Sequence, residues 1–228
     1  MYMSLYKDTV QTHDNFFANP DKVVELSNLV EYTNGTEYPG RRSVNLLQSN
    51  NFRLVEFSKY FAKRLADEVF YGLTQFQLDI RFHKNDVYDD PAANAGWIHA
   101  DGIAFAGVVY LNKSELSIDT GTSIFLKTSA DEFITSDFTS RQQLNLTKQV
   151  SKEYLEDLKQ NHSNFTETIK VGNVFNRLVA YDSNMWHCPT NYYLKSGEDR
   201  TSLVFFIDQA AFVPLPSQVG ITSTWSDK

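Results

Sequence analysis

Two histidines, one aspartate and one arginine could together hold a metal ion and an anion beside it. His99 and Asp101 lie two residues apart, so in an extended segment both side chains point to the same face. The best candidate for a third ligand is His187. Two imidazoles and one carboxylate occupy one face of an octahedral Fe(II) ion and leave three positions open. The residue types therefore indicate a non-haem iron site.

The spacing of His99 and Asp101 is a weak signal by itself. With five histidines and 28 acidic residues among 228, there is roughly an even chance that one such pair arises by accident. The alternative is an aspartate that orients its neighbouring histidine with no metal present. His187 has an alternative too, as an ordinary half-buried strand histidine. Zinc held by thiolates alone is excluded, because Cys188 is the single cysteine.

Arg200 supplies the cation of this set. It precedes the apolar run 203–207, and a guanidinium buried at the head of such a strand needs an anionic partner. A carboxylate bound through two parallel hydrogen bonds would be a suitable partner. Ser202 lies on the same strand face and would donate a further hydrogen bond. The alternative is a surface arginine.

The composition excludes several classes of function. The net charge of -7 and a pI near 5.2 argue against binding of a nucleic-acid backbone, which needs clustered Lys and Arg. No apolar run approaches the roughly 18 residues of a membrane span. Residues 1–14 lack the basic and apolar stretches of a signal peptide, and a single cysteine allows no intrachain disulfide. We therefore expect a cytoplasmic protein (host cytoplasm if it comes from a phage) with no nucleic-acid or membrane partner. The oligomeric state stays open.

Hydrophobic periodicity predicts helices first and strands afterwards. Apolar residues recur at helical spacing over 16–30 and 52–70, with Gly72 as the stop of the second helix. An exposed amphipathic helix is predicted over 147–162. Polar segments 84–96 and 127–146 are predicted loops. The predicted strands are 76–82, 103–111, 121–126, 174–181, 186–193 and 201–207.

These elements predict an α+β protein that is mainly β. The strands would form a two-sheet jelly roll, with the N-terminal helices packed on one sheet. No linker divides the chain, so we expect one domain over 1–228. It would comprise a helical lead-in over 1–72 and a β core over 73–228, with the helical insert near 147–162.

Five stretches resemble the Fe(II)/2-oxoglutarate-dependent oxygenases in their order and spacing. The resemblance is closest to the prolyl-4-hydroxylase-like branch of bacteria and phages. The stretches are Trp97-Ile98-His99-Ala100-Asp101-Gly102, Val109-Tyr110-Leu111-Asn112, Gly121-Thr122-Ser123-Ile124-Phe125, Asn184-Met185-Trp186-His187 and Arg200-Thr201-Ser202. The resemblance implies a double-stranded β-helix, which is a jelly roll of two sheets.

The resemblance also implies the site. His99, Asp101 and His187 would be the iron ligands, and 2-oxoglutarate would chelate the iron with its far carboxylate on Arg200 and Ser202. O2 is then the second co-substrate, and ascorbate a supporting reductant. No catalytic residue is expected beyond the metal centre.

Four aromatic residues are further candidates. Tyr88 and Tyr110 would help to bind the co-substrate, and Trp97 and Trp186, each beside a ligand, would wall the substrate pocket. For all four the alternative is simple packing. The predicted loops 84–96 and 127–146 are candidate lids, with plain surface connection as their alternative.

The implied reaction is hydroxylation, with a prolyl residue of a peptide or protein as one candidate substrate. Gly96 and Ala106 stand where many prolyl hydroxylases have Tyr and Thr, so a free amino acid or another small metabolite stays an alternative. A further alternative is a jelly-roll binding module without turnover.

Overall fold

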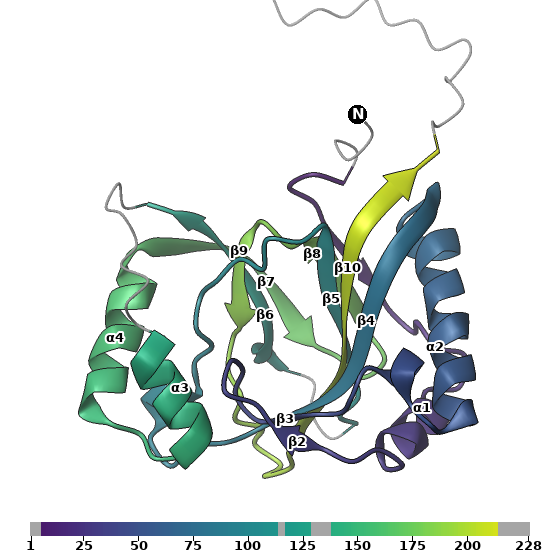
Figure 1. Ribbon diagram of the computed structural model, residues 1–228. Helices are drawn as coiled ribbons and strands as arrows, with labels where there is room; N and C mark the ends of the chain where they lie inside the picture. Colours follow the sequence, from purple (N-terminus) through teal and green to yellow (C-terminus); the bar gives the residue numbers. More distant parts are fainter. Residues whose placement is uncertain (1–5, 114–116, 129–137, 214–228) are drawn as a thin grey trace, which may run out of the picture.

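A computed structural model describes residues 6–113, 117–128 and 138–213, which form two antiparallel sheets and several helices (Figure 1). The strands are β1 (Val10–His13), β2 (Thr33–Asn34), β3 (Arg41–Arg42), β4 (Leu73–Asn85), β5 (Phe105–Tyr110), β6 (Ser117–Lys127), β7 (Phe165–Asn173), β8 (Leu178–Asp182), β9 (Trp186–Pro189) and β10 (Arg200–Phe212). The α-helices are α1 (Pro20–Ser27), α2 (Phe52–Arg64), α3 (Phe138–Thr147) and α4 (Lys152–Ser163). Short helical turns occupy Leu46–Gln48, Leu65–Val69 and Pro91–Asn94.

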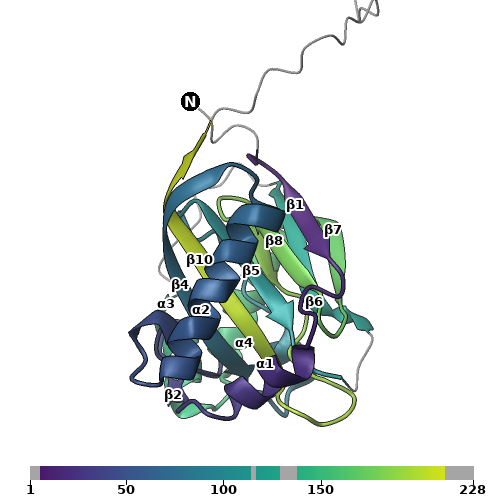
Figure 2. The same cartoon turned by 90° about the vertical axis from the view of Figure 1, so that its right-hand side faces the viewer.

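The larger sheet has seven strands in the order β1-β8-β5-β10-β4-β3-β2. Alternation along its strands gives it two different faces. Phe82, Leu203 and Phe205 point to one face and are fully buried against α2, whose Phe61 lies in the same cluster. Figure 2 shows α2 lying across this face. The predicted packing of N-terminal helices on one sheet is therefore confirmed.

The opposite face of the large sheet looks toward the smaller sheet, whose order is β7-β6-β9. Val108 and Val179 from the large sheet share a buried cluster with Ile124 and Val171 from the small one. The two sheets thus pack against each other over part of their width. The remaining width is occupied by the cavity described below.

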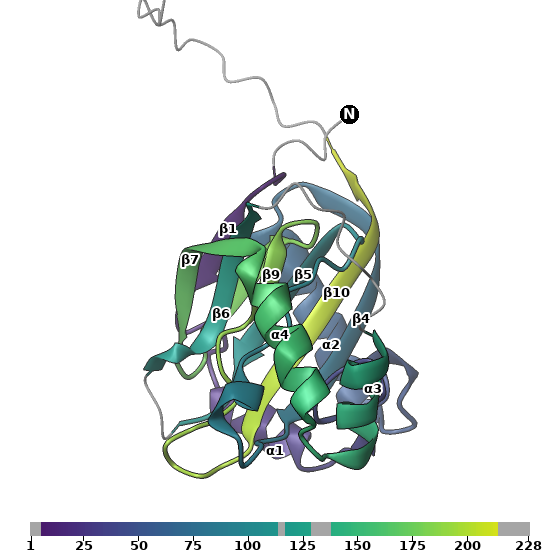
Figure 3. The ribbon, with the colours of Figure 1, turned by 90° about the vertical axis from the view of Figure 1, so that its left-hand side faces the viewer.

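Helix α4, seen in front in Figure 3, forms hydrogen bonds with the segment just before His99. The side-chain amide of Asn161 donates to the carbonyl of Ile98 at 3.0 Å and accepts from its N–H at 2.9 Å. His162 Nε2 lies 2.8 Å from the carbonyl oxygen of Gly96. The helix therefore fixes the backbone on the N-terminal side of His99.

Most predicted elements are confirmed, with shifted ends. The helix predicted over 52–70 is α2 continued by the turn Leu65–Val69, and the strands predicted over 76–82, 103–111, 121–126 and 201–207 are β4, β5, β6 and β10. Among the described residues, no helix is both long and apolar enough to cross a membrane.

Three predicted boundaries are wrong for reasons of local backbone geometry. The strand predicted over 174–181 begins only at Leu178, because Asn176 adopts a φ of 62° and turns the chain between β7 and β8. The helix predicted over 147–162 begins at Lys152, since Lys148 has a φ of 59° and Ser151 caps the helix. Strand β9 ends at Pro189, short of the predicted end at 193.

Five elements are absent from the sequence prediction: β1, β2, β3, β7 and α3. β1 has four residues and is defined by its pairing with β8, which no local pattern reveals. α3 begins inside the segment 127–146, where the sequence predicts a loop, and ends at Thr147; residues 129–137 of that segment lie outside the described ranges.

Candidate metal centre

His99 and His187 face each other across an antiparallel bridge. The N–H of His99 donates to the carbonyl of His187 at 3.0 Å, and the reverse bond is 2.9 Å. Residues paired in this way project their side chains to the same face, and the two rings lie 4.5 Å apart. Asp101 is held by its own N–H, which donates to the carbonyl of Ser183 at 2.9 Å.

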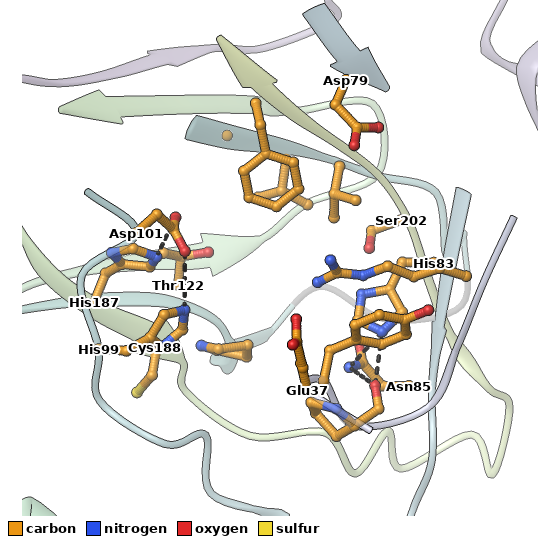
Figure 4. A pocket seen from close by; sticks show the side chains of 18 of the residues that line it. Glu37, Asp79, His83, Asn85, His99, Asp101, Thr122, His187, Cys188 and Ser202 are labelled. Atoms are coloured by element: carbon orange, nitrogen blue, oxygen red, sulfur yellow. Dashed lines mark hydrogen bonds and ion pairs between the residues drawn. The ribbon is translucent and has the colours of Figure 1, made fainter. Parts of the chain in front are cut away.

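The three side chains converge on one point of the cavity (Figure 4). The Nε2 atom of His99 lies 3.5 Å from Asp101 Oδ1, and that of His187 lies 3.4 Å from Asp101 Oδ2. One donor atom from each residue lies within 4.8 Å of the others, so the group could hold a metal ion. The structure therefore brings together the three ligands that the sequence predicted.

Main-chain carbonyls orient both imidazoles. His99 Nδ1 lies 2.8 Å from the carbonyl oxygen of Trp97, and His187 Nδ1 lies 2.9 Å from that of Met185. A nitrogen that faces a carbonyl carries the proton, which leaves the lone pair on Nε2. Each histidine is thus set by the residue two positions before it to present Nε2 to the common point.

The charges at this point suit a divalent cation. Burial raises the pKa of Asp101, but the hydrogen-bonding environment of His187 and His99 outweighs it, so the pKa lies below the usual range. Burial and the neighbouring His187 lower the pKa of His99. At neutral pH the site therefore offers one carboxylate and unprotonated imidazole nitrogen. Asp101 Oδ2 is buried, and among the described residues it has only the long 3.4 Å contact with His187 Nε2, which leaves it able to bind a cation.

Arg200 lies buried in the same cavity and has only neutral partners. Its exposed fraction is 3%. It donates to the carbonyl of Thr120 at 2.9 Å, to Asn85 Oδ1 at 2.9 Å and to the carbonyl of Gly121 at 3.3 Å. No carboxylate of the described residues forms an ion pair with it, and burial lowers its pKa. A buried guanidinium without a counter-charge is costly, and an anion entering the cavity would relieve that cost.

Ser202, on the same strand as Arg200, has a hydroxyl without a hydrogen bond to the described residues. Its Oγ is buried and has no hydrogen-bond partner within the described chain. The register places Ser202 opposite His83 on β4 and Tyr110 on β5. Arg200, Ser202 and the three candidate ligands all line one polar cavity of about 680 Å³.

The four aromatic candidates are placed differently from one another. Trp97 lines the cavity. The ring of Tyr110 lies 5.4 Å from the Arg200 guanidinium, and its hydroxyl is 2.7 Å from Thr122 Oγ1. Tyr88 packs in a cluster with Trp97 outside the cavity lining, and Trp186 packs against Phe165 at 4.9 Å. The structure thus brings Trp97 and Tyr110 to the site, but not Tyr88 or Trp186.

Several cavity residues were not predicted as part of the site. Asn85 and His83 extend the alternating polar face of the strand predicted over 76–82, so the period-two pattern was a usable signal. Thr122 follows Gly121 in a stretch that the resemblance had marked. Arg42 comes from a loop-like stretch far away in the sequence, and nothing local placed it here.

Sequence comparison gives one family profile and no curated protein. The profile of a family of unknown function (DUF6445) matches residues 89–191, a span that holds all three candidate ligands. No curated protein matches the sequence.

Solved structures are similar in fold. AviO1 from Streptomyces viridochromogenes Tue57 superposes with a TM-score of 0.53 at 11% identity, over 93% of this chain and 95% of its own. HygX from Streptomyces hygroscopicus, solved with nickel and 2-oxoglutarate bound, has a TM-score of 0.52 at 10% identity, over 87% and 82%. A prolyl-4-hydroxylase from Pseudomonas putida reaches only 0.45 at 14% identity, over 89% and 94%. The predicted resemblance to the Fe(II)/2-oxoglutarate-dependent oxygenases is thus confirmed at the level of the fold.

Proposed function

We propose that this protein is an Fe(II)- and 2-oxoglutarate-dependent hydroxylase. The observation that carries the proposal is the composition of one cavity. It joins a His-Asp-His cluster, whose donor atoms lie within 4.8 Å, to a buried arginine that has no described acidic partner. Either feature alone has a structural explanation. Together they could bind a metal ion and a dicarboxylate, one end of which would coordinate the metal while the other paired with the arginine.

Each site residue has a role in this proposal. His99, Asp101 and His187 hold Fe(II) through two Nε2 atoms and a carboxylate oxygen. Arg200 binds the far carboxylate of 2-oxoglutarate, and the Ser202 hydroxyl donates to the same group. When bound, the iron and 2-oxoglutarate supply the oxidising chemistry with O2. The chain itself positions these groups and keeps bulk water from them.

The carbonyls of Trp97 and Met185 keep the metal-binding nitrogens unprotonated, and the neutral acceptors around Arg200 leave its charge for the co-substrate. Trp97 walls the cavity beside His99. The chain needs no general base, because hydroxylation would convert a C–H bond to C–OH with the hydrogen taken up by the oxidant that iron, 2-oxoglutarate and O2 would supply. Thr122, which lies between Tyr110 and the cavity, limits the space around the co-substrate.

We further propose that residues 1–228 form one oxygenase domain and that its two sheets are the halves of a double-stranded β-helix. The candidate substrate is a prolyl residue of a peptide or protein. The alternative is a free amino acid or other small metabolite. HygX, with the same fold, has also been solved with hygromycin B bound, which favours keeping the small-molecule alternative.

Succinate release from 2-oxoglutarate tests the proposal. Wild-type protein with Fe(II) and ascorbate should release succinate slowly without substrate, whereas His99→Ala should release none. His13→Ala, a histidine on β1 outside the cavity lining, is the matched control and should behave as wild type. If wild-type protein binds neither Ni(II) nor 2-oxoglutarate in calorimetry, the non-catalytic alternative is favoured. Candidate substrates are then screened by mass spectrometry for the gain of one oxygen.

A further inference from the structure

Arg42 and Arg141 line the cavity in addition to Arg200, and Arg42 has no role in the site described so far. It lies on the short strand β3, directly after Arg41, and its side chain lines the same cavity as the candidate ligands. The register places Arg42 opposite His83, and His83 opposite Ser202. Arg42 is therefore two strand spacings from Ser202, roughly 10 Å, on the same face of the sheet.

In the described ranges, the guanidinium of Arg42 has contacts with two aromatic rings and no ion pair. It stacks on Tyr38 at 4.0 Å and lies 5.6 Å from the ring centre of Phe206. Its Nε is buried and has no hydrogen-bond partner in the described part of the chain. Arg41 and Arg81, by contrast, pair with Asp199 and Asp79 at 2.9 and 2.7 Å.

This environment leaves the charge of Arg42 uncompensated. Burial lowers its pKa to about 10, and Asp101 and Asp79 act on it only from beyond ion-pair distance. Cation–π contact recovers part of the cost of desolvation, but it leaves the planar edge of the guanidinium free. That edge matches the two oxygens of a carboxylate or the oxygens of a phosphate.

We propose that Arg42 is the anchor for an oxyanion of the substrate, a carboxylate or a phosphate. The inference rests on the proposed function, since it names the class of substrate that the same cavity takes. Arg200 with Ser202 serves the co-substrate, and Arg42 serves the substrate from two strands away on the same face of the sheet. Tyr38, stacked on the guanidinium, orients its free edge. The proposal favours an acidic small molecule over an internal prolyl residue, which carries no such group.

Small probes test the anchor without knowledge of the substrate. Acetate, methylphosphonate and neutral acetamide each carry a methyl group whose binding is measurable by saturation-transfer NMR. The protein is loaded with Zn(II) and excess 2-oxoglutarate, so that Arg200 is occupied. Arg42→Gln should weaken the binding of at least one anionic probe roughly tenfold or more, the loss expected for one charge-assisted pair. Arg42→Lys should restore part of it, and Arg41→Gln, the neighbouring arginine with its own acidic partner, should match wild type. Acetamide should bind to none of them.

The outcomes separate the anchor from the proposed function. Acetate favoured over methylphosphonate indicates a carboxylate substrate, and the reverse indicates a phosphate. Equal binding of both anions by wild type and Arg42→Gln overturns the proposal. So does a comparable loss of 2-oxoglutarate affinity in Arg42→Gln, because Arg42 would then belong to the co-substrate. If wild type binds no 2-oxoglutarate but still binds anions through Arg42, the hydroxylase fails and the anion site stands. Thermal unfolding of each variant shows that it is folded.

Discussion

At the scale of single residues, the decisive feature is that Arg200 is surrounded by neutral oxygens. Two main-chain carbonyls and the amide of Asn85 satisfy its N–H groups without cancelling its charge. A carboxylate in the place of the amide would make a self-contained ion pair. The choice of an amide therefore keeps the cavity ready for an external anion.

Asn85→Asp tests this feature. The new carboxylate should pair with Arg200 and compete with 2-oxoglutarate, whose Kd should rise roughly tenfold to a hundredfold. The free energy of unfolding should stay equal or increase, because the buried charge gains a partner. Calorimetry with Ni(II) present gives the Kd, and urea unfolding gives the stability. An unchanged Kd would contradict the assigned role of Arg200.

Ser202→Ala should separate binding from stability. The Oγ of Ser202 is buried without a hydrogen-bond partner among the described residues, so its removal relieves an unsatisfied group and should leave stability unchanged or raise it by about 1 kcal/mol. The affinity for 2-oxoglutarate should nevertheless fall, by roughly fivefold, with loss of one hydrogen bond. Ser123→Ala is a useful comparison: its hydroxyl lies 2.7 Å from Thr190 Oγ1, so its loss should cost stability and spare binding.

His83 should make the fold sensitive to acid. Burial, followed by the charge of Arg42, lowers its pKa well below 6.5. Below about pH 6.5, His83 binds a proton in the unfolded chain but stays neutral in the folded protein. The free energy of unfolding therefore falls with decreasing pH, by at most about 1.4 kcal/mol per pH unit for this group. His83→Gln should reduce that slope. Urea unfolding at pH 7.5, 6.5 and 5.5 measures both slopes, and parallel slopes would refute the assignment.

At the scale of elements, an irregularity in β6 builds the acceptors for Arg200. The register with β7 shifts between Ser117 and Thr122, where Thr120 and Gly121 turn their carbonyls toward the arginine. Gly121 is required there, because a Cβ would collide with the carbonyl oxygen of Val171. Because of this irregularity, two backbone carbonyls of β6 accept hydrogen bonds from Arg200 and so become part of the proposed anion site.

Gly121→Ala should therefore damage both the sheet and the site. The strands must separate, which should cost about 1–3 kcal/mol of unfolding free energy and also weaken 2-oxoglutarate binding. Gly172→Ala is the matched control on β7, where the nearest atoms would lie 3.3 Å from the new Cβ. We expect the control to lose less stability and to bind 2-oxoglutarate as wild type does. Similar losses in both variants would show that the close approach at Gly121 is unimportant.

At the scale of the whole molecule, the site couples distant parts of the fold. The segment before β5, strand β9 and strand β10 each contribute, from the two sheets. A ligand that bridges the metal and Arg200 therefore ties the sheets together. Its binding energy adds directly to the stability of the folded state.

Metal and 2-oxoglutarate should consequently raise the Tm together. At one hundred times Kd a ligand adds about 2.7 kcal/mol, which corresponds to roughly 5–10 °C for a chain of this size. Ni(II) with 2-oxoglutarate should give this shift in wild type, and chelation should reverse it. His187→Ala should show no shift with either ligand. A shift of equal size in that variant would place the ligands elsewhere.

The sequence by itself determined the residues that lie next to each other along a strand. The i, i+2 spacing placed His99 with Asp101 and Arg200 with Ser202, because strand alternation is a local property. Hydrophobic periodicity located α2 and four strands for the same reason. His187 was already the best candidate for the third ligand, and the resemblance supported it through the order of the segments.

Only the tertiary structure decided what depends on pairing between distant strands. The bridge between His99 and His187, the carbonyls that orient the two rings, and the approach of Asn85 to Arg200 join residues far apart in the chain. Arg42 enters the cavity because β3 pairs with β4, a register that no local pattern encodes. Tyr88 was a candidate because of its residue type and its position in the sequence. Its side chain packs outside the cavity, because the fold determines the direction in which it points. The sequence therefore indicated the types of residue at the candidate site, whereas strand register decided which charged side chains line the cavity.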